Sequence, residues 1–229
     1  MVEELLTMHL FLPKNFRGFI PFLLLLFCLP PALQAAPNAF TTDDSIKAAR
    51  DYLDQQDYDA ALKALAPALQ ATTNDPEVLN LQGAILTKQT NYAAALACYQ
   101  KVLQISPGYF PAVYNVGALL ALEHRWPEAT TYFRNLLIEQ PNNELVEFKL
   151  LLLLLHENAD LPLQAKLFAT DLPTNTPAWY YSRAARNYKK GDPIEAAKYL
   201  EVAKNIYGDK TKIYQEELDE SGLNSLPSK

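Results

Sequence analysis

Apolar residues between Leu79 and Pro141 recur every three or four positions, and turn residues divide this pattern into short amphipathic stretches that predict helices. The second half of the region repeats the first at a fixed interval of 34 residues. The matched positions are Gly83 and Gly117, Tyr92 and Trp126, Ala95 and Ala129, Tyr99 and Phe133, and Pro107 and Pro141. A repeat of this length predicts a stack of helix pairs, because one pair by itself cannot bury its apolar face.

The order of large and small residues within this region resembles that of a known family, the tetratricopeptide repeat. The residues that carry the resemblance are Leu79, Gly83, Leu86, Ala95, Tyr99 and Pro107. The resemblance implies an all-α fold, a right-handed superhelical stack of about five helix–turn–helix units with a C-terminal capping helix. It also implies a scaffold that binds a partner, without naming that partner.

The predicted array spans residues 45–207, with units at about 42–75, 76–109, 110–143, 144–176 and 177–208. Small residues at the matched positions let neighbouring helices approach closely, whereas large ones fill the space between them. In the first unit, Pro67 predicts a bend or a break in the last turn of the second helix. The fourth unit is degenerate. Residues 142–156 form an apolar helix that should be covered on most sides, and residues 161–170 form its short partner.

The segment after the array predicts one more helix, at residues 209–221, with Gly222 as its end. It is polar and acidic, which suits the polar end cap that a repeat array needs. Acidic pairs such as Glu216 and Glu217 are expected on solvated faces. Residues 222–229 are expected to form a flexible tail.

Residues 1–35 have the pattern of a secretory signal peptide. Lys14 and Arg17 precede an apolar run at residues 19–29, and small residues follow that run. Cleavage is expected after Ala35, which leaves residues 36–44 as a linker. The alternative is an uncleaved anchor, because the cleavage site matches the pattern imperfectly. The chain is therefore expected to be exported, either periplasmic or secreted, or anchored in the inner membrane by residues 19–29, with no other membrane contact.

Composition narrows the function classes. A net charge of −6 argues against a nucleic-acid partner, and an apolar fraction of 49% is enough for a folded core. Cys98 lies in a repeat helix, where a small buried side chain is the expected role. His9, His124 and His156 lack the spacing of a metal site, and His156 is expected to be an ordinary surface residue. No catalytic or cofactor fingerprint is present, so the sequence predicts no enzyme activity, no metal and no cofactor.

In the tetratricopeptide repeat family, the first helix of each unit lines a concave groove that holds the partner. By resemblance, the groove positions of this chain are Asn80, Lys88, Tyr114, Phe148, Tyr181 and Tyr188. Their aromatic side chains either anchor a bound peptide or helix, or pack on neighbouring helices or under the C-terminal helix. The sequence does not choose between the two. Further basic residues of the family's clamp for terminal carboxylates are absent, so that clamp is not expected.

The predicted function is therefore a non-enzymatic, exported, protein-binding scaffold that holds a partner protein or peptide in its groove. An alternative of another class is a structural, self-assembling homo-oligomer of the cell envelope, in which the apolar fourth unit packs on its copy. A further alternative is a non-catalytic subunit of an enzyme or assembly complex. The oligomeric state of the purified chain separates self-assembly from the binding of a different partner.

Overall fold

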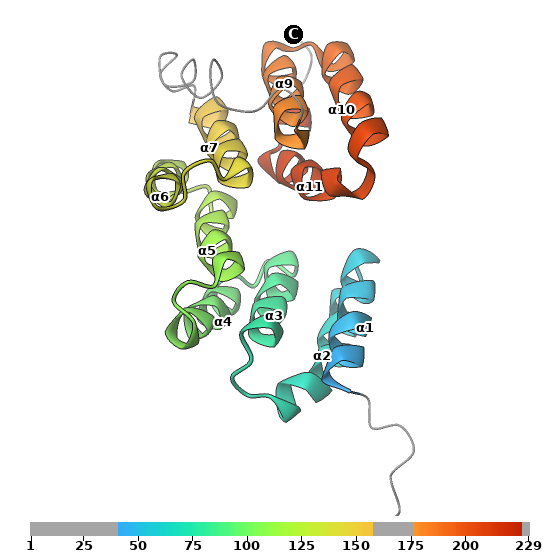
Figure 1. Cartoon of the computed structure of the whole chain (residues 1–229), viewed down its shortest axis with the longest axis vertical. Coiled ribbons are helices and arrows are strands. Elements are labelled where there is room, and N and C mark those ends of the chain that lie inside the picture. The colour runs from blue at the N-terminus through green and yellow to red at the C-terminus, as the bar shows by residue number, and fades with distance from the viewer. Residues whose placement is uncertain (1–40, 158–175, 226–229) are drawn as a thin grey trace, which may run out of the picture. The chain divides into compact units, whose positions relative to one another are not determined.

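The computed structural model describes residues 41–157 and 176–225, and within these ranges the regular structure is helical throughout (Figure 1). The predicted all-α class is confirmed. The α-helices are α1 Thr42–Asp54, α2 Tyr58–Ala71, α3 Pro76–Lys88, α4 Tyr92–Ile105, α5 Phe110–Leu122, α6 Trp126–Glu139, α7 Glu144–Glu157, α9 Pro177–Lys190, α10 Pro193–Tyr207 and α11 Lys212–Ser221. Two short 3-10 helices, η1 Gly208–Thr211 and η2 Leu223–Ser225, flank α11. The predicted signal peptide and the partner helix expected at residues 161–170 lie outside the described residues.

The helices form pairs that stack in chain order. α1 packs on α2, α3 on α4, α5 on α6, and α9 on α10, and each of the first three pairs also contacts the helix that follows it. The apolar core follows the same plan, because three of its clusters are each built from one pair and the first helix of the next. A fourth cluster joins α7, α9, α10, α11 and η2. The core is therefore shared between successive units, as the repeat predicts.

The small residues at matched positions are the points of closest helix approach. A methyl group added to Gly83 would lie 2.5 Å from Cε1 of Tyr99, and one added to Gly117 would lie 2.5 Å from Cδ1 of Tyr132. Ala95 and Ala129 are fully buried. For these units the prediction is confirmed that small residues let the helices approach closely and bulky residues fill the space between them.

A capping side chain fixes the start of α3. Oδ1 of Asp75 accepts hydrogen bonds from the backbone N–H groups of Glu77 and Val78, at 2.8 and 3.3 Å. Of the two outcomes predicted at Pro67, a bend or a break, the break is wrong, since α2 continues to Ala71. The missing N–H removes one bond near the end of a helix whose other residues, including the buried Leu65, remain packed.

The turns inside the four helix pairs that the structure describes each contain one residue in the left-handed backbone region. Gln56, Thr90 and His124 have φ values of 61°, 60° and 59°, and they lie one repeat apart. The last pair has Gly191 there, with φ of 81°. The repeat pattern in the sequence does not reveal this turn position, because the residue type differs from unit to unit while the backbone conformation is kept.

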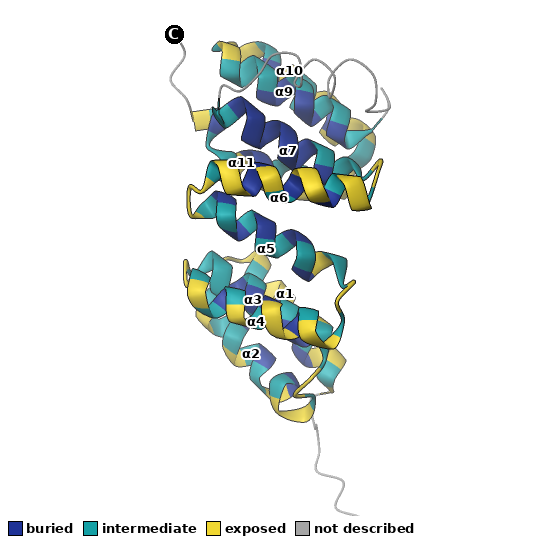
Figure 2. Cartoon of the chain, turned by 90° about the vertical axis from the view of Figure 1, so that its left-hand side faces the viewer, coloured by how far each residue is buried: buried dark blue, intermediate teal, exposed yellow. Residues whose placement is uncertain are grey.

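The apolar helix of the fourth unit is covered as expected. Every residue of α7 from Phe148 to Leu155 is buried. Figure 2 shows α7 buried along most of its length, whereas α6, which packs on it, exposes its outer face. Lys149 is among these buried residues, so α7 carries one charged side chain that is buried together with its leucines.

Candidate functional site

The C-terminal helix α11 lies against the first helices of earlier units. α10 ends at Tyr207 and is followed by Gly208, whose φ of 55° and ψ of −128° suit a residue without a side chain. The 3-10 turn η1 follows, and α11 then packs on α7 and α9 (Figure 1). The segment predicted as an end cap therefore begins at Lys212 and covers part of the face where the groove was predicted.

A buried ion pair fixes α11 to this face. The carboxylate of Glu217 on α11 pairs with Nζ of Lys149 on α7 through Oε2. Its Oε1 accepts a hydrogen bond of 2.8 Å from the hydroxyl of Tyr114 on α5. The Lys149 and Glu217 side chains are 5% and 9% exposed. Burial and the neighbouring carboxylate raise the pKa of Tyr114 well above its ordinary value, so the hydroxyl keeps its proton as a donor.

Apolar contacts surround the ion pair. Leu218 on α11 and Leu223 on η2 are almost completely buried, in one cluster with Phe148 and Tyr181. The rings of Phe148 and Tyr214 meet edge to face at a centroid distance of 5.6 Å. Burial raises the pKa of Tyr214 to about 12. α11 is therefore part of the core at this end of the array.

The outer contacts of α11 are more exposed. Lys88 on α3 pairs with Glu220 at 2.8 Å, and Lys212 pairs with Asp54 on α1, also at 2.8 Å. The side chains of the second pair are more than half exposed. Exposed pairs of this kind contribute roughly 0–1 kcal/mol each. α11 is thus held mainly by α7 and α9, and only weakly by α1.

His156 has a structural role that the sequence did not indicate. Its ring stacks on Trp126 with centroids 4.3 Å apart. Its Nε2 lies 2.8 Å from the backbone oxygen of Ser221, the last residue of α11. The expectation of an ordinary surface residue is wrong. The histidine joins α6, α7 and the end of α11 instead.

The predicted groove residues divide into two groups. Lys88, Tyr114, Phe148 and Tyr181 contact α11, the last through a hydrogen bond of 3.1 Å from its hydroxyl to Gln215. Tyr114, Phe148 and Tyr181 are at most 5% exposed.

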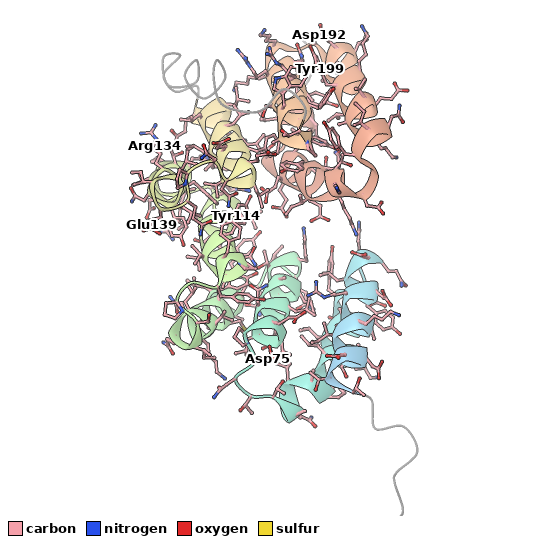
Figure 3. All side chains as sticks on the ribbon, viewed as in Figure 1. Asp75, Tyr114, Arg134, Glu139, Asp192 and Tyr199 are labelled. Carbon is pink, nitrogen blue, oxygen red and sulfur yellow. The ribbon has the colours of Figure 1, made fainter. Side chains whose placement is uncertain are left out.

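The other two groove residues lie elsewhere on the array. Asn80 accepts a hydrogen bond of 3.2 Å from Asn115. Tyr188 packs at the edge of the apolar cluster that joins α7, α9, α10, α11 and η2. In Figure 3, Tyr114 lies on the part of α5 next to α7, whereas Arg134 and Glu139 project from α6 away from α11.

A cavity of about 420 Å³ lies beside α11, on the part of this face that α11 leaves uncovered. Its walls come from α1, α3, α4, α5, α11 and the start of α7. Lys88 and Tyr114 are the predicted groove residues that line it. The face therefore has one part filled by α11 and one part open to a ligand.

Sequence reasoning missed the two residues that organise the site, Lys149 and Glu217. Glu217 was expected on a solvated face, and this expectation is wrong because the side chain is buried and ion-paired. A signal was present in Lys149, a single cation next to a run of leucines in a helix that had to be covered. That signal predicts a buried partner carboxylate but does not indicate which segment supplies it.

Residues 41–157 and 176–225 contain neither a metal site nor a membrane-spanning helix. No group of three or more His, Cys, Asp or Glu side chains there is arranged to hold a metal ion. None of the helices in those ranges combines the length and the apolar character that crossing a membrane requires.

Comparison with known proteins agrees with the architecture. Residues 46–110 match the family model of the tetratricopeptide repeat, so the chain contains repeats of this class. No curated protein matches the sequence.

Solved structures with a similar fold include two bacterial proteins. A tetratricopeptide repeat protein from Parabacteroides merdae has a TM-score of 0.62 and 18% identity, over 79% of this chain and 71% of that one. PilF of Pseudomonas aeruginosa has a TM-score of 0.50 and 22% identity, over 79% and 82%. At these identities the likeness shows the fold alone.

Proposed function

We propose that this chain is a non-enzymatic scaffold that binds a partner protein or peptide in the cavity beside α11. The observation that carries the proposal is the cavity itself, which lies where the first helices of the early units meet α11. Its volume of about 420 Å³ falls within the range of about 300–1,000 Å³ typical of ligand sites. Tetratricopeptide repeats generally serve as non-catalytic binding scaffolds, which supports the same assignment.

The proposed site is narrower than the predicted stripe of groove residues. Phe148 and Tyr181 are packed under α11 and belong to the core. Lys88 and Tyr114 remain at the cavity wall. A partner would therefore meet the faces of α1, α3 and α5 and the adjoining face of α11.

Photo-crosslinking in the native host tests the proposal. A photoreactive amino acid at Ala118 places the probe in the cavity wall, and the same amino acid at Asn135, an exposed residue of α6, serves as the matched control. We expect a discrete adduct with a second protein from position 118 and none from position 135. No adduct from position 118 would contradict the proposal, and an adduct between two copies of the chain would favour self-assembly.

We further propose that the protein is exported, on the support of the signal-peptide pattern in residues 1–35. N-terminal sequencing of the protein isolated from its host should then begin at Ala36. A chain that keeps residues 1–35 and sediments with membranes would support the anchored form. An intact chain found in the soluble cytoplasmic fraction would contradict export.

A further inference from the structure

The cavity beside α11 has an unbalanced set of charges. Its ionisable lining residues are Lys88, Glu216, Glu217, Glu220, Tyr99 and Tyr114. Glu217 is paired with Lys149 and Glu220 with Lys88. Within the described ranges, Glu216 forms no ion pair and no hydrogen bond of its side chain. One carboxylate therefore stands at the cavity without a cation of its own.

The nearest cations are already engaged elsewhere. Lys88 is held by Glu220 at 2.8 Å, and Lys212 is held by Asp54 at the same distance. Burial raises the pKa of Glu216, and the attraction of these two lysines offsets that effect only in part. Glu216 is an exposed residue overall, so a ligand can reach its carboxylate, and a cation brought by that ligand would find no competing direct partner there.

The rest of the cavity wall is mainly apolar. The apolar side chains that matter here are Leu53, Phe110, Ala118, Leu122, Leu145 and Ile213. Ile213 belongs to α11 and is 44% exposed although it is a large aliphatic residue. Covering such surface yields roughly 25 cal/mol for each Å² removed from water. The wall thus offers apolar area next to a single unpaired negative charge.

We infer that the cavity takes a peptide segment of the partner in which an arginine stands beside bulky apolar side chains. The guanidinium group pairs with Glu216, and the apolar side chains pack on Ile213 and Leu122. Arginine fits better than lysine, because its planar group also stacks on an aromatic ring such as Phe110 and is less strongly hydrated. This inference rests on the proposed function and names the kind of partner.

α11 acts as a wall of this site and stays in place when the peptide binds. Glu216 and Ile213 both lie on α11, so a ligand that displaced this helix would lose the groups that recognise it. Because the peptide contacts α11 in its docked position, binding stabilises that position by linkage. Amide hydrogens of residues 212–225 should therefore exchange more slowly in the complex.

Calorimetric titration of the full chain with a defined probe tests the charge requirement. The probe is a short blocked peptide with one arginine between leucines, and two matched peptides replace the arginine with glutamine or glutamate. The arginine peptide should bind about tenfold more tightly than the glutamine peptide, and the glutamate peptide should bind most weakly. The preference should diminish at high salt, since the pair is partly exposed. Equal binding of all three peptides, or binding of none, overturns the inference.

Three variants locate the effect. Glu216→Lys should reverse the order of the peptides, whereas Glu201→Lys makes the same change of net charge on an exposed position of α10 and should leave it unchanged. Ala118→Phe fills the cavity and should abolish binding of every peptide. An unchanged order in Glu216→Lys, or faster exchange of residues 212–225 in the complex, overturns the inference.

The two proposals fail in different ways. If position 118 crosslinks to a partner but Glu216→Lys keeps that adduct, the cavity binds a partner of other chemistry and the proposed function stands. If position 118 gives no adduct in the host, the proposed function itself fails, whatever the peptides do.

Discussion

Removal of the charge of Glu217 should strongly destabilise the chain. Glu217→Gln keeps the shape of the side chain and an acceptor for the hydroxyl of Tyr114, which donates to it at 2.8 Å. It leaves Lys149, whose side chain is 5% exposed, without a counter-ion. The substitution therefore isolates one quantity, the cost of a buried ammonium group that has lost its carboxylate.

The size of the effect follows from the burial of both partners. Breaking a buried ion pair by removing one member costs about 3–5 kcal/mol, because the remaining charge is desolvated and uncompensated. If α11 can undock and expose Lys149 to water, the loss is limited to the free energy that docks α11. In that case residues 208–225 become accessible to proteases before the array unfolds.

The assay is urea unfolding followed by circular dichroism, together with limited proteolysis at Lys210 and Lys212. Glu216→Gln is the matched control, because it removes the same charge one residue earlier, from an exposed side chain. The Glu216→Gln variant should have the same free energy of unfolding as the parent chain at neutral pH. Adding Lys149→Met to Glu217→Gln removes the orphan charge and should recover most of the lost stability.

The reasoning fails if Glu217→Gln unfolds within about 0.5 kcal/mol of both the parent chain and the Glu216→Gln control, with unchanged proteolysis. It also fails if the double variant is less stable than the single one. Either result would mean that Lys149 reaches water without the help of α11.

Further predictions concern the repeats themselves. Thr90→Gly should raise the free energy of unfolding by about 1 kcal/mol in thermal denaturation, since Thr90 is exposed and has φ of 60°. Gly83→Ala should destabilise by about 1–3 kcal/mol in urea, because its methyl group would meet Tyr99 at 2.5 Å, whereas Gly108→Ala, with open space around it, should not. Burial raises the pKa of Tyr99 and Tyr214 to about 12. The folded chain therefore keeps protons that unfolded tyrosines release near pH 10, and the urea midpoint should fall as pH rises from about 10 to 12. Burial also raises the pKa of the Cys98 thiol, so alkylation of Cys98 at neutral pH should be slower than that of a free model thiol, as measured by mass spectrometry.

Much of the fold could be predicted from local pattern. The interval between Gly83 and Gly117 and the apolar run in α7 each reflect interactions between residues at short or regular distances along the chain. The site was harder to predict. Tyr114 and Phe148 were placed on the right face, but the sequence did not choose between their roles as peptide anchors and as residues under the C-terminal helix. The structure places both beneath α11.

The sequence by itself determined the helix pairs, their order and the positions where they touch, because those depend on neighbours no more than one repeat away. The tertiary structure alone decided where α11 lies. Its contacts join residues far apart in the chain, such as Lys149 with Glu217 and Lys88 with Glu220. An acidic amphipathic helix has the same pattern whether water or a groove covers it, so only folding reveals that its carboxylate meets a buried lysine and that a cavity remains beside it.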